Sequence, residues 1–384
     1  MDRWVRPIGR GWVVEGAVPG PDVDEFAEPE AVTKALAAAE GDTLLAAQHP
    51  ARTPAALAAG LDVEAALPEA RATLERLLTG HYRPETGFVA AYRIGETIAG
   101  VLCLVDVREL TSAGAHVKHT EEVYPEVVAE RAAVLDGLGC ATSAALLVPV
   151  GDGAELTAAV KEAVGAADPD VSTVDRAGLS HELWVVRPGE LQERLLEAAS
   201  ASDLLVADGN HRVAAAAGSG QLLALITAGS QLEIRAINRV LLGTGHSAES
   251  LFAAWQAAGL DVAWSDDSTP PSCPGTAVVL AGSRVLSVRL PAGDPLVIDH
   301  EVVEQTLLGS ALGLDPDGPH VRPLLPGSPV PPDADAVVQL APVPFETVQA
   351  VHAAGRRMPR KATYFTPKPR GGLVLARWYC ADRY

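Results

Sequence analysis

Two β-type runs separated by a glycine turn constrain the fold of this chain more than any other feature. Residues 88–94 and 97–107 are rich in apolar and β-branched side chains, and Gly95 lies between them. This pattern predicts a β-hairpin. Ala-rich segments with helical spacing precede and follow it, at residues 55–78 and 125–138. Such a mixture predicts an α+β fold of mixed β-sheets with flanking helices, rather than a doubly wound parallel sheet.

The length of 384 residues predicts two lobes, because a single hydrophobic core rarely grows to that size. We place an N-terminal lobe at residues 1–244 and a C-terminal lobe at residues 245–384. The second lobe differs from the first in amino-acid composition, because it contains a Ser/Pro-rich segment at 265–275 and a Pro-rich one at 325–333. One continuous domain is the alternative.

The net charge of −19 excludes a general nucleic-acid surface, which requires clustered Lys and Arg in excess. A local basic pocket for one phosphorylated ligand is compatible with that charge. The four cysteines form no CxxC pair, so neither a disulfide framework nor a zinc site is expected. We find no signal peptide and no apolar run of membrane-spanning length, and therefore expect a cytoplasmic protein without a membrane partner.

The clearest chemical signal is the sequence ADGNHR at residues 207–212. An apolar run leads into Asp208 and Gly209, and an Ala-rich helix is expected directly afterwards. Unpaired backbone N–H groups at such a junction favour an anion, and glycine lets a ligand approach the backbone. Arg212 is suited to gripping phosphate oxygens through its planar guanidinium.

Two other side chains of this loop have candidate roles. His211 is suited to donating to phosphate or carrying a proton, and Asp208 to binding Mg²⁺ or orienting the histidine. An ordinary helix start explains the same residues, with Asp208 as N-cap and with His211 and Arg212 exposed to solvent.

A second signal lies near the C-terminus, where residues 356–370 contain six cations in an otherwise acidic chain. Arg360, Lys361 and Lys368 are among them, and the Thr363 hydroxyl lies between. This composition suits a phosphate or carboxylate pocket. A solvated basic loop that balances nearby acidic surface is the alternative.

The third signal is the segment HVKHTEE at residues 116–122. A carboxylate near imidazoles suits a general base or a magnesium ligand. His116 and His119 with a glutamate also suit a transition metal, although a solvated loop explains the same residues.

Together the three segments resemble the bacterial family called domain of unknown function 1015. The family's central motif, Ala-Asp-Gly-His-His-Arg, matches residues 207–212, and its C-terminal motif, Met-Pro-x-Lys-Ser-Thr-x-Phe-x-Pro-Lys, matches residues 358–368. This family is similar to the free serine kinases. The resemblance therefore implies a ParB/sulfiredoxin-like core, additional C-terminal α/β elements and a loop that holds nucleotide phosphates.

The resemblance extends to individual residues of the site. It places the phosphate on Gly209, Asn210, His211 and Arg212, and on Lys361, Thr363 and Lys368, and we add Arg360 of the basic segment as a further phosphate contact. It makes Glu121 the base for the acceptor hydroxyl, with Asp208 and His211 as further catalytic residues. Two positions depart from the family pattern, since Asn210 and Thr120 stand where the family has histidines. Asparagine still donates and accepts hydrogen bonds, so phosphate binding is expected to persist.

These observations lead to a small-molecule phosphotransferase that uses ATP or ADP, with Mg²⁺, to phosphorylate serine or a similar hydroxyl-bearing metabolite. Phosphoryl transfer depends mainly on charge neutralisation, which the cations supply. The alternative is a non-catalytic regulatory protein that binds a nucleotide or a phosphometabolite. A DNA-partitioning role suits the fold but not the acidic charge. Oligomeric state stays open, with a homodimer as one arrangement.

Overall fold

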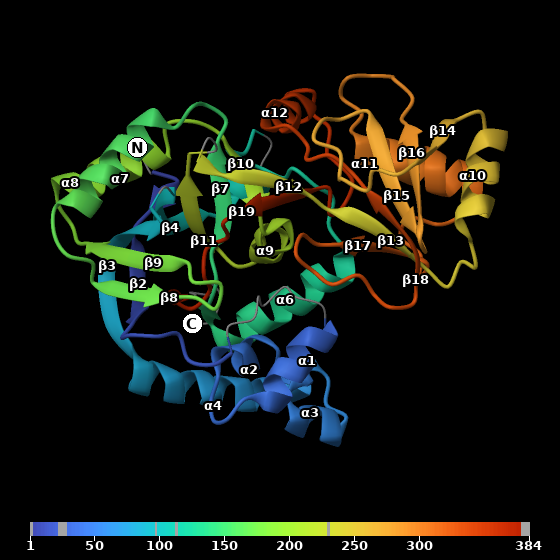
Figure 1. The fold of residues 1–384 in the computed structure, drawn as a ribbon. Helices are drawn as coiled ribbons and strands as arrows, with labels where there is room; N and C mark the ends of the chain where they lie inside the picture. The colour runs from blue at the N-terminus through green and yellow to red at the C-terminus, as the bar shows by residue number, and fades with distance from the viewer. Residues whose placement is uncertain (1–2, 22–28, 97, 112–113, 229–230, 378–384) are drawn as a thin grey trace. The chain divides into compact units, whose positions relative to one another are not determined.

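The computed structural model describes residues 3–21, 29–96, 98–111, 114–228 and 231–377, and its elements are labelled in Figure 1. Helices and strands alternate in an irregular order, and the strands form mixed sheets. The α+β class predicted from the sequence is thereby confirmed. The ParB/sulfiredoxin-like core stays a prediction.

The chain forms two compact units. The first comprises Met1–His119, Val123–Leu232 and Pro367–Tyr384, and the second comprises Thr120–Glu122 and Glu233–Thr366. These units differ from the predicted lobes, which divide the chain once, after residue 244. The reason is strand pairing. The C-terminal strand β20 (Val374–Arg377) pairs with β2 and β6 of the first unit, and Glu121 forms a β-bridge with Met358 of the second.

A 12-stranded mixed sheet is the centre of the first unit. Its main path runs β5-β10-β7-β11-β4-β3-β2-β20-β6. The pairs β10–β5 and β11–β7 are parallel, whereas the other pairs are antiparallel. Besides β20, its strands are β1 (Val5–Arg6), β2 (Ile8–Val14), β3 (Tyr82–Ile94), β4 (Ile98–Asp106), β5 (Val117–Lys118), β6 (Cys140–Ala141), β7 (Ala145–Pro149), β8 (Val171–Val174), β9 (Ser180–Val186), β10 (Leu204–Asp208) and β11 (Gln221–Thr227).

The predicted hairpin is confirmed in this sheet. Strands β3 and β4 pair in antiparallel register from Ala90 opposite Leu102 to Ile94 opposite Ile98. The turn glycine, Gly95, has a φ of 59°, the left-handed conformation that such turns require. Residue 97, where the second run was predicted to begin, lies outside the described residues, as do Trp378 and Cys380.

Several helices of the first unit contact strands of its sheet, and α6 packs against both α4 and α9. Helix α7 contacts strands β3, β4 and β9, as well as its neighbour α8. The helices are α1 (Pro29–Ala38), α2 (Leu44–Gln48), α3 (Pro54–Ala59), α4 (Val63–His81), α5 (Arg108–Thr111), α6 (Pro125–Leu138), α7 (Ala154–Gly165), α8 (Glu190–Ala199) and α9 (Asn210–Ala216), with a 3₁₀ turn at Pro50–Arg52.

The prediction of a single helix at residues 55–78 is wrong. Residues 55–78 form two helices, α3 and α4, rather than one. Gly60 ends α3 in the left-handed conformation, with a φ of 64°, and Asp62 caps α4 by accepting from the N–H of Ala65 at 2.9 Å. A C-terminal glycine followed by an N-cap aspartate is the usual signature of such a break.

The second unit contains a six-stranded antiparallel sheet of order β14-β16-β15-β18-β13-β17 and a two-stranded sheet of β12 and β19. Its elements are β12 (Glu233–Ala236), β13 (Asn238–Leu242), α10 (Ala248–Ala257), β14 (Asp261–Ser265), β15 (Thr276–Ala281), β16 (Arg284–Arg289), α11 (Asp299–Val302), a π-helical segment at Val303–Ser310, β17 (Val321–Leu324), β18 (Ala334–Gln339), α12 (Phe345–Ala353) and β19 (Thr363–Thr366).

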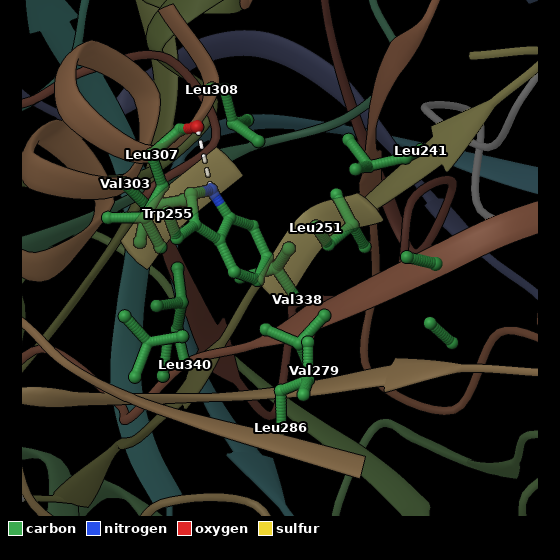
Figure 2. Close-up of a cluster of buried hydrophobic side chains, with 14 of the residues drawn as sticks. Leu241, Leu251, Trp255, Val279, Leu286, Val303, Leu307, Leu308, Val338 and Leu340 are labelled. Atoms are coloured by element: carbon green, nitrogen blue, oxygen red, sulfur yellow. Dashed lines mark hydrogen bonds between the residues drawn. The ribbon is translucent and has the colours of Figure 1, made fainter. Parts of the chain in front are cut away.

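Trp255 of helix α10 lies at the centre of the core of this unit. Its side chain is fully buried among aliphatic residues that include Leu251, Val338 and Leu340 (Figure 2). The indole N–H donates to the backbone carbonyl of Leu307 at 3.0 Å, so the one polar atom of the ring is satisfied.

Within the described residues, no helix combines the length and the apolar character needed to span a membrane.

Candidate functional site

The predicted junction of strand, turn and helix is present at the ADGNHR segment. Residues 204–207 of strand β10 are buried, and Asp208, its last residue, is partly exposed. Gly209 follows with a φ of 93° and forms the N-cap of α9. A residue with a Cβ is strained in that conformation, so the sharp turn accounts for the glycine.

Asp208 lies between two cations. One carboxylate oxygen accepts from the guanidinium of Arg212, and the other lies 2.7 Å from the ammonium of Lys368. The side chains of these three residues are 12–24% exposed, so the cluster is partly screened from water. Asp208 therefore does not act as an N-cap and Arg212 is not a solvated side chain, so the ordinary helix start is wrong.

Helix α9 is short, at seven residues. A helix of about two turns carries only a small macrodipole, and the affinity for an anion then rests on side chains rather than on the helix end. The cluster of Asp208, Arg212 and Lys368 has one negative and two positive charges, which leaves a net positive charge for an anionic ligand.

Asn210 and His211 both have defined partners within the first unit. The side-chain oxygen of Asn210 accepts from Nδ1 of His119 at 3.1 Å, which assigns the proton of that imidazole to Nδ1. Nε2 of His211 accepts from the backbone N–H of Tyr124 at 3.0 Å, and the two rings stack with centroids 5.8 Å apart.

We expect Gly209→Ala to displace Arg212. An added Cβ would lie 2.7 Å from Nε and 2.9 Å from an amino nitrogen of Arg212, in a left-handed backbone conformation. Strain and clash together are expected to cost roughly 1–3 kcal/mol of unfolding free energy, measured by urea denaturation. Gly218→Ala is the control, because nothing lies within 4 Å of an added Cβ there. Equal losses in the two variants would contradict this contact.

The remaining predicted residues form a separate group in the second unit, centred on Glu121. This carboxylate is buried, with 9% of the residue exposed. One of its oxygens accepts from the backbone N–H of Ala362 at 3.2 Å and of Thr363 at 2.9 Å, and from the Thr363 hydroxyl at 2.7 Å. The other accepts from the N–H of Lys361 at 3.2 Å.

The segment 361–363 is therefore an anion-binding nest that holds a carboxylate of this chain. Lys361 has a φ of 54° and is the one residue other than glycine with a positive φ among the described residues. That conformation turns successive N–H groups toward a common point, as in phosphate-binding loops. Of the side chains predicted to bind a phosphate, the Thr363 hydroxyl donates to Glu121 in this structure.

Burial raises the pKa of Glu121, whereas the hydrogen bonds from Thr363 and Ala362 and the charge of Lys361 act in the opposite direction. Both oxygens are occupied by these four hydrogen bonds, so a substrate hydroxyl would have to displace donors of residues 361–363 to reach the carboxylate. Its contacts favour a structural role over that of a general base.

Arg239 holds the same segment from its carbonyl side. Its guanidinium, only 3% exposed, donates to the carbonyl oxygens of Arg360 and Lys361 at 3.2 Å and pairs with Glu304 at 2.7 Å. The side chain of Arg360 pairs with Asp317 at 2.6 Å. The backbone at 360–363 is thus contacted on both faces by buried charged side chains, those of Glu121 and Arg239.

His300 is buried beside this group and makes stability depend on pH. Burial and the nearby Arg239 lower its pKa to about 3, and its Nε2 lies 3.0 Å from the carbonyl oxygen of Ile237. The unfolded chain takes up this proton near pH 6.5, but the folded chain does not, so stability is lost as pH falls from about 6.5 toward 3.

We therefore expect His300→Gln to flatten the acid limb of the stability profile by up to about 1.4 kcal/mol per pH unit between those values. Urea denaturation at a series of pH values measures this slope. His81→Gln, which removes an exposed histidine of α4, is the matched control and should leave the limb unchanged. Parallel slopes for wild type and His300→Gln would refute the assignment.

The described residues do not fit a resident Mg²⁺. Both oxygens of Asp208 bind cations, which repel a metal ion, and no cluster of three or more His, Cys, Asp or Glu suited to a metal is found in the described ranges. His116 pairs with Asp203 at 2.6 Å, and His119 with Asn210. The transition-metal alternative for His116 and His119 thus has no geometric support.

The structure thus gathers the predicted site residues into two groups, one in each unit. The first contains residues 208–212 with Lys368, and the second contains Glu121 with residues 360–363. Arg239 was missed by the sequence analysis. A charged residue directly before the apolar run Val240–Leu242 is the signal that marks it, because a buried arginine needs a partner.

Comparisons with known proteins give weak structural likenesses. No curated protein matches the sequence significantly. A conserved hypothetical protein from Pyrococcus furiosus is 12% identical, with 70% of this chain and 93% of that chain covered and a TM-score of 0.39. SbnI from Staphylococcus aureus with a C-terminal truncation is 17% identical, with 70% and 84% covered and a TM-score of 0.40. A free serine kinase in complex with AMP is 12% identical, with 71% and 92% covered and a TM-score of 0.39. These likenesses assign no activity to this chain.

A family model gives the clearest match. The model described as "Protein of unknown function (DUF1015)" matches residues 62–301, which include Glu121 and the ADGNHR segment but end before the basic C-terminal segment. The match spans more than half of the sequence and confirms the predicted family. This chain therefore belongs to the DUF1015 family of proteins of unknown function.

Proposed function

We propose that this protein is a small-molecule phosphotransferase that holds the transferred phosphoryl group between Arg212 and Lys368. The observation that carries the proposal is the cluster in which both cations contact the single carboxylate of Asp208. A guanidinium matches phosphate oxygens in pairs, and an ammonium adds a compact positive charge. Together they neutralise the charge on a phosphoryl group in transfer, which is the main requirement of this chemistry.

The donor is a nucleotide such as ATP, and the acceptor is a small metabolite with a hydroxyl group, such as serine. As the phosphate binds, Arg212 and Lys368 turn toward it and release the oxygens of Asp208. The acceptor oxygen forms a bond to the terminal phosphorus, the bond from phosphorus to the bridging oxygen breaks, and the hydroxyl proton passes to Asp208. This assignment replaces Glu121 as the base, because both oxygens of Glu121 bind residues 361–363.

Calorimetric titration with ATP, ADP and CTP tests the phosphate contacts. Arg212→Ala and Lys368→Met should each weaken binding by at least about tenfold, since each removes one charge-assisted contact worth roughly 1.5–3 kcal/mol. Arg187→Ala and Lys161→Met are matched controls, because both residues are exposed charges of the same unit. Equal binding by wild type and both site variants would end the proposal.

A second function is favoured by a separate observation. Glu121 and His211, two of the three predicted catalytic residues, make structural hydrogen bonds. This supports a regulatory protein that binds a nucleotide or phosphometabolite without turning it over. Phosphorus NMR with serine and a panel of small hydroxyl compounds separates the two, because only the phosphotransferase yields a phosphorylated acceptor.

A further inference from the structure

Lys368, whose ammonium group pairs with Asp208, lies in a short segment of the first unit that leads into strand β20. A proline precedes it and another follows it, at Pro367 and Pro369. A proline fixes its own φ and restricts the residue before it, so the backbone around Lys368 has few conformations. Arg370, two residues further on, anchors this segment to the sheet of the first unit.

Arg370 is held at two points. Its backbone N–H donates to the hydroxyl oxygen of Tyr92 on strand β3 at 3.1 Å. Its guanidinium donates to the carbonyl oxygen of Val174, the last residue of β8, at 3.2 Å. Tyr92 is only 1% exposed, whereas the contact to Val174 lies at the surface. We expect the contact to Tyr92 to hold the segment more firmly, because water competes less with a buried hydrogen bond.

The Tyr92 hydroxyl is itself oriented by a buried histidine. Nδ1 of His181 lies 2.7 Å from the hydroxyl oxygen, and Nε2 of the same ring lies 3.3 Å from a carboxylate oxygen of Asp175. An ionised carboxylate only accepts, so Nε2 carries the proton at that contact, and Nδ1 of the neutral ring accepts from Tyr92. Burial raises the pKa of Tyr92, so the hydroxyl keeps the hydrogen that it donates.

Asp175 completes this chain of contacts at the turn between β8 and β9. Burial raises the pKa of its carboxyl, but the hydrogen bonds from Leu179 and His181 outweigh burial and hold the pKa below its usual value. The carboxylate is therefore ionised at neutral pH and orients the imidazole. The donors of Arg370, Tyr92 and His181 thus all point toward Asp175, and hydrogen bonds in such a series strengthen one another.

We propose that Tyr92 is a positioning residue for the phosphate cluster: by holding the N–H of Arg370, it places the ammonium group of Lys368 on Asp208. The proposal rests on the proposed function, because Lys368 is one of the two phosphate ligands there. A tyrosine that only stabilises the core leaves ligand affinity unchanged. A positioning residue changes affinity through Lys368, and this effect vanishes when Lys368 is absent.

A double-mutant cycle tests this coupling. Calorimetric titration of the full chain with ATP compares wild type, Tyr92→Phe, Lys368→Met and the variant with both changes. Tyr92→Phe removes one hydroxyl, keeps the ring, and should weaken ATP binding by about threefold to tenfold, the range expected for one hydrogen bond. In the Lys368→Met background, the same change should have no further effect. A loss of equal size in both backgrounds would overturn the proposal.

Tyr82→Phe is the matched control. Tyr82 is also a buried tyrosine of β3, and its hydroxyl donates to the carbonyl oxygen of Gly372 at 2.9 Å. Gly372 keeps a second anchor without that hydroxyl, because its N–H donates to the carbonyl oxygen of Thr142 at 2.9 Å. Tyr82→Phe should therefore bind ATP as wild type does. A loss of affinity as large as that of Tyr92→Phe would show that the role is not specific to Tyr92.

A measurement without nucleotide separates this proposal from the proposed function. Nitrogen-15 NMR of the lysine ammonium groups detects the ion pair of Lys368 directly, and the signal is assigned by its absence in Lys368→Met. Tyr92→Phe should shift or broaden this signal, and Tyr82→Phe should not. An unchanged signal in Tyr92→Phe would overturn the positioning role. ATP binding by Lys368→Met as tight as that of wild type would instead count against the phosphotransferase, while the NMR comparison still decides the role of Tyr92.

Discussion

Glu121→Ala is expected to lower the unfolding free energy by roughly 3–5 kcal/mol, among the largest effects of a single substitution in this chain. The loss arises because three backbone N–H groups and one hydroxyl, all from residues 361–363, lose their common acceptor. Lys361 holds a left-handed backbone conformation that the carboxylate stabilises. Urea denaturation measures the loss, and amide hydrogen exchange at residues 361–363 locates it.

Two variants sharpen this test. Glu121→Gln keeps one carbonyl oxygen for Thr363 and Ala362 but presents an amide group to the N–H of Lys361, so an intermediate loss is expected. Glu122→Ala is the matched control, because its side chain is exposed and its backbone contact to Met358 is retained. If Glu121→Ala and Glu122→Ala unfold at the same urea concentration, the nest does not stabilise the fold.

The local elements of this fold were predictable from the sequence. The hairpin around Gly95, the strand and helix on either side of Gly209, and the helix α6 at Pro125–Leu138 all follow from hydrophobic period and glycine position. The break at Gly60 was missed, because the Ala-rich residues on both sides continue a helical pattern across it. Local patterns identify elements well, but their ends depend on a single capping residue.

The partners of the candidate site residues were beyond the reach of such patterns. Lys368 pairs with Asp208 across 160 positions of the sequence, and Glu121 bonds residues 361–363 across about 240. The sequence predicted that the ADGNHR segment and the basic segment at residues 356–370 bind anions. Clustered cations in an acidic chain indicate such a function. It did not show that Glu121 is the anion that one of them binds, since this depends on strand pairing between distant segments.

The same limit applies to buried charges. Arg239 and His300 are almost completely buried, yet nothing in their immediate neighbours along the chain shows which backbone carbonyls they contact. Their roles emerge only when the strand β13 and the helix α11 are placed together in one unit. Composition thus predicted that the basic segment binds an anion, and topology shows that residues 361–363 bind the carboxylate of Glu121.

If the protein is a phosphotransferase, Asp208→Asn is expected to reduce kcat by about 10²–10⁴-fold, the usual contribution of a general base. The same change should tighten nucleotide binding. It removes the negative charge that competes with phosphate for Arg212 and Lys368. Opposite effects on turnover and affinity are the distinguishing result, measured by phosphorus NMR and calorimetry on the same preparation.

Lys368→Met gives the complementary result, because loss of the ammonium should weaken nucleotide binding and slow turnover together. Asp203→Asn is the matched control, since this half-exposed aspartate precedes the same strand and pairs with His116 rather than with the cluster. It should change neither quantity. Tighter binding in Asp208→Asn with no turnover in wild type would identify the cluster as a regulatory nucleotide site. Unchanged affinity in both Asp208→Asn and Lys368→Met would remove the phosphate from this cluster altogether, because no ligand of that charge is indifferent to losing either neighbour.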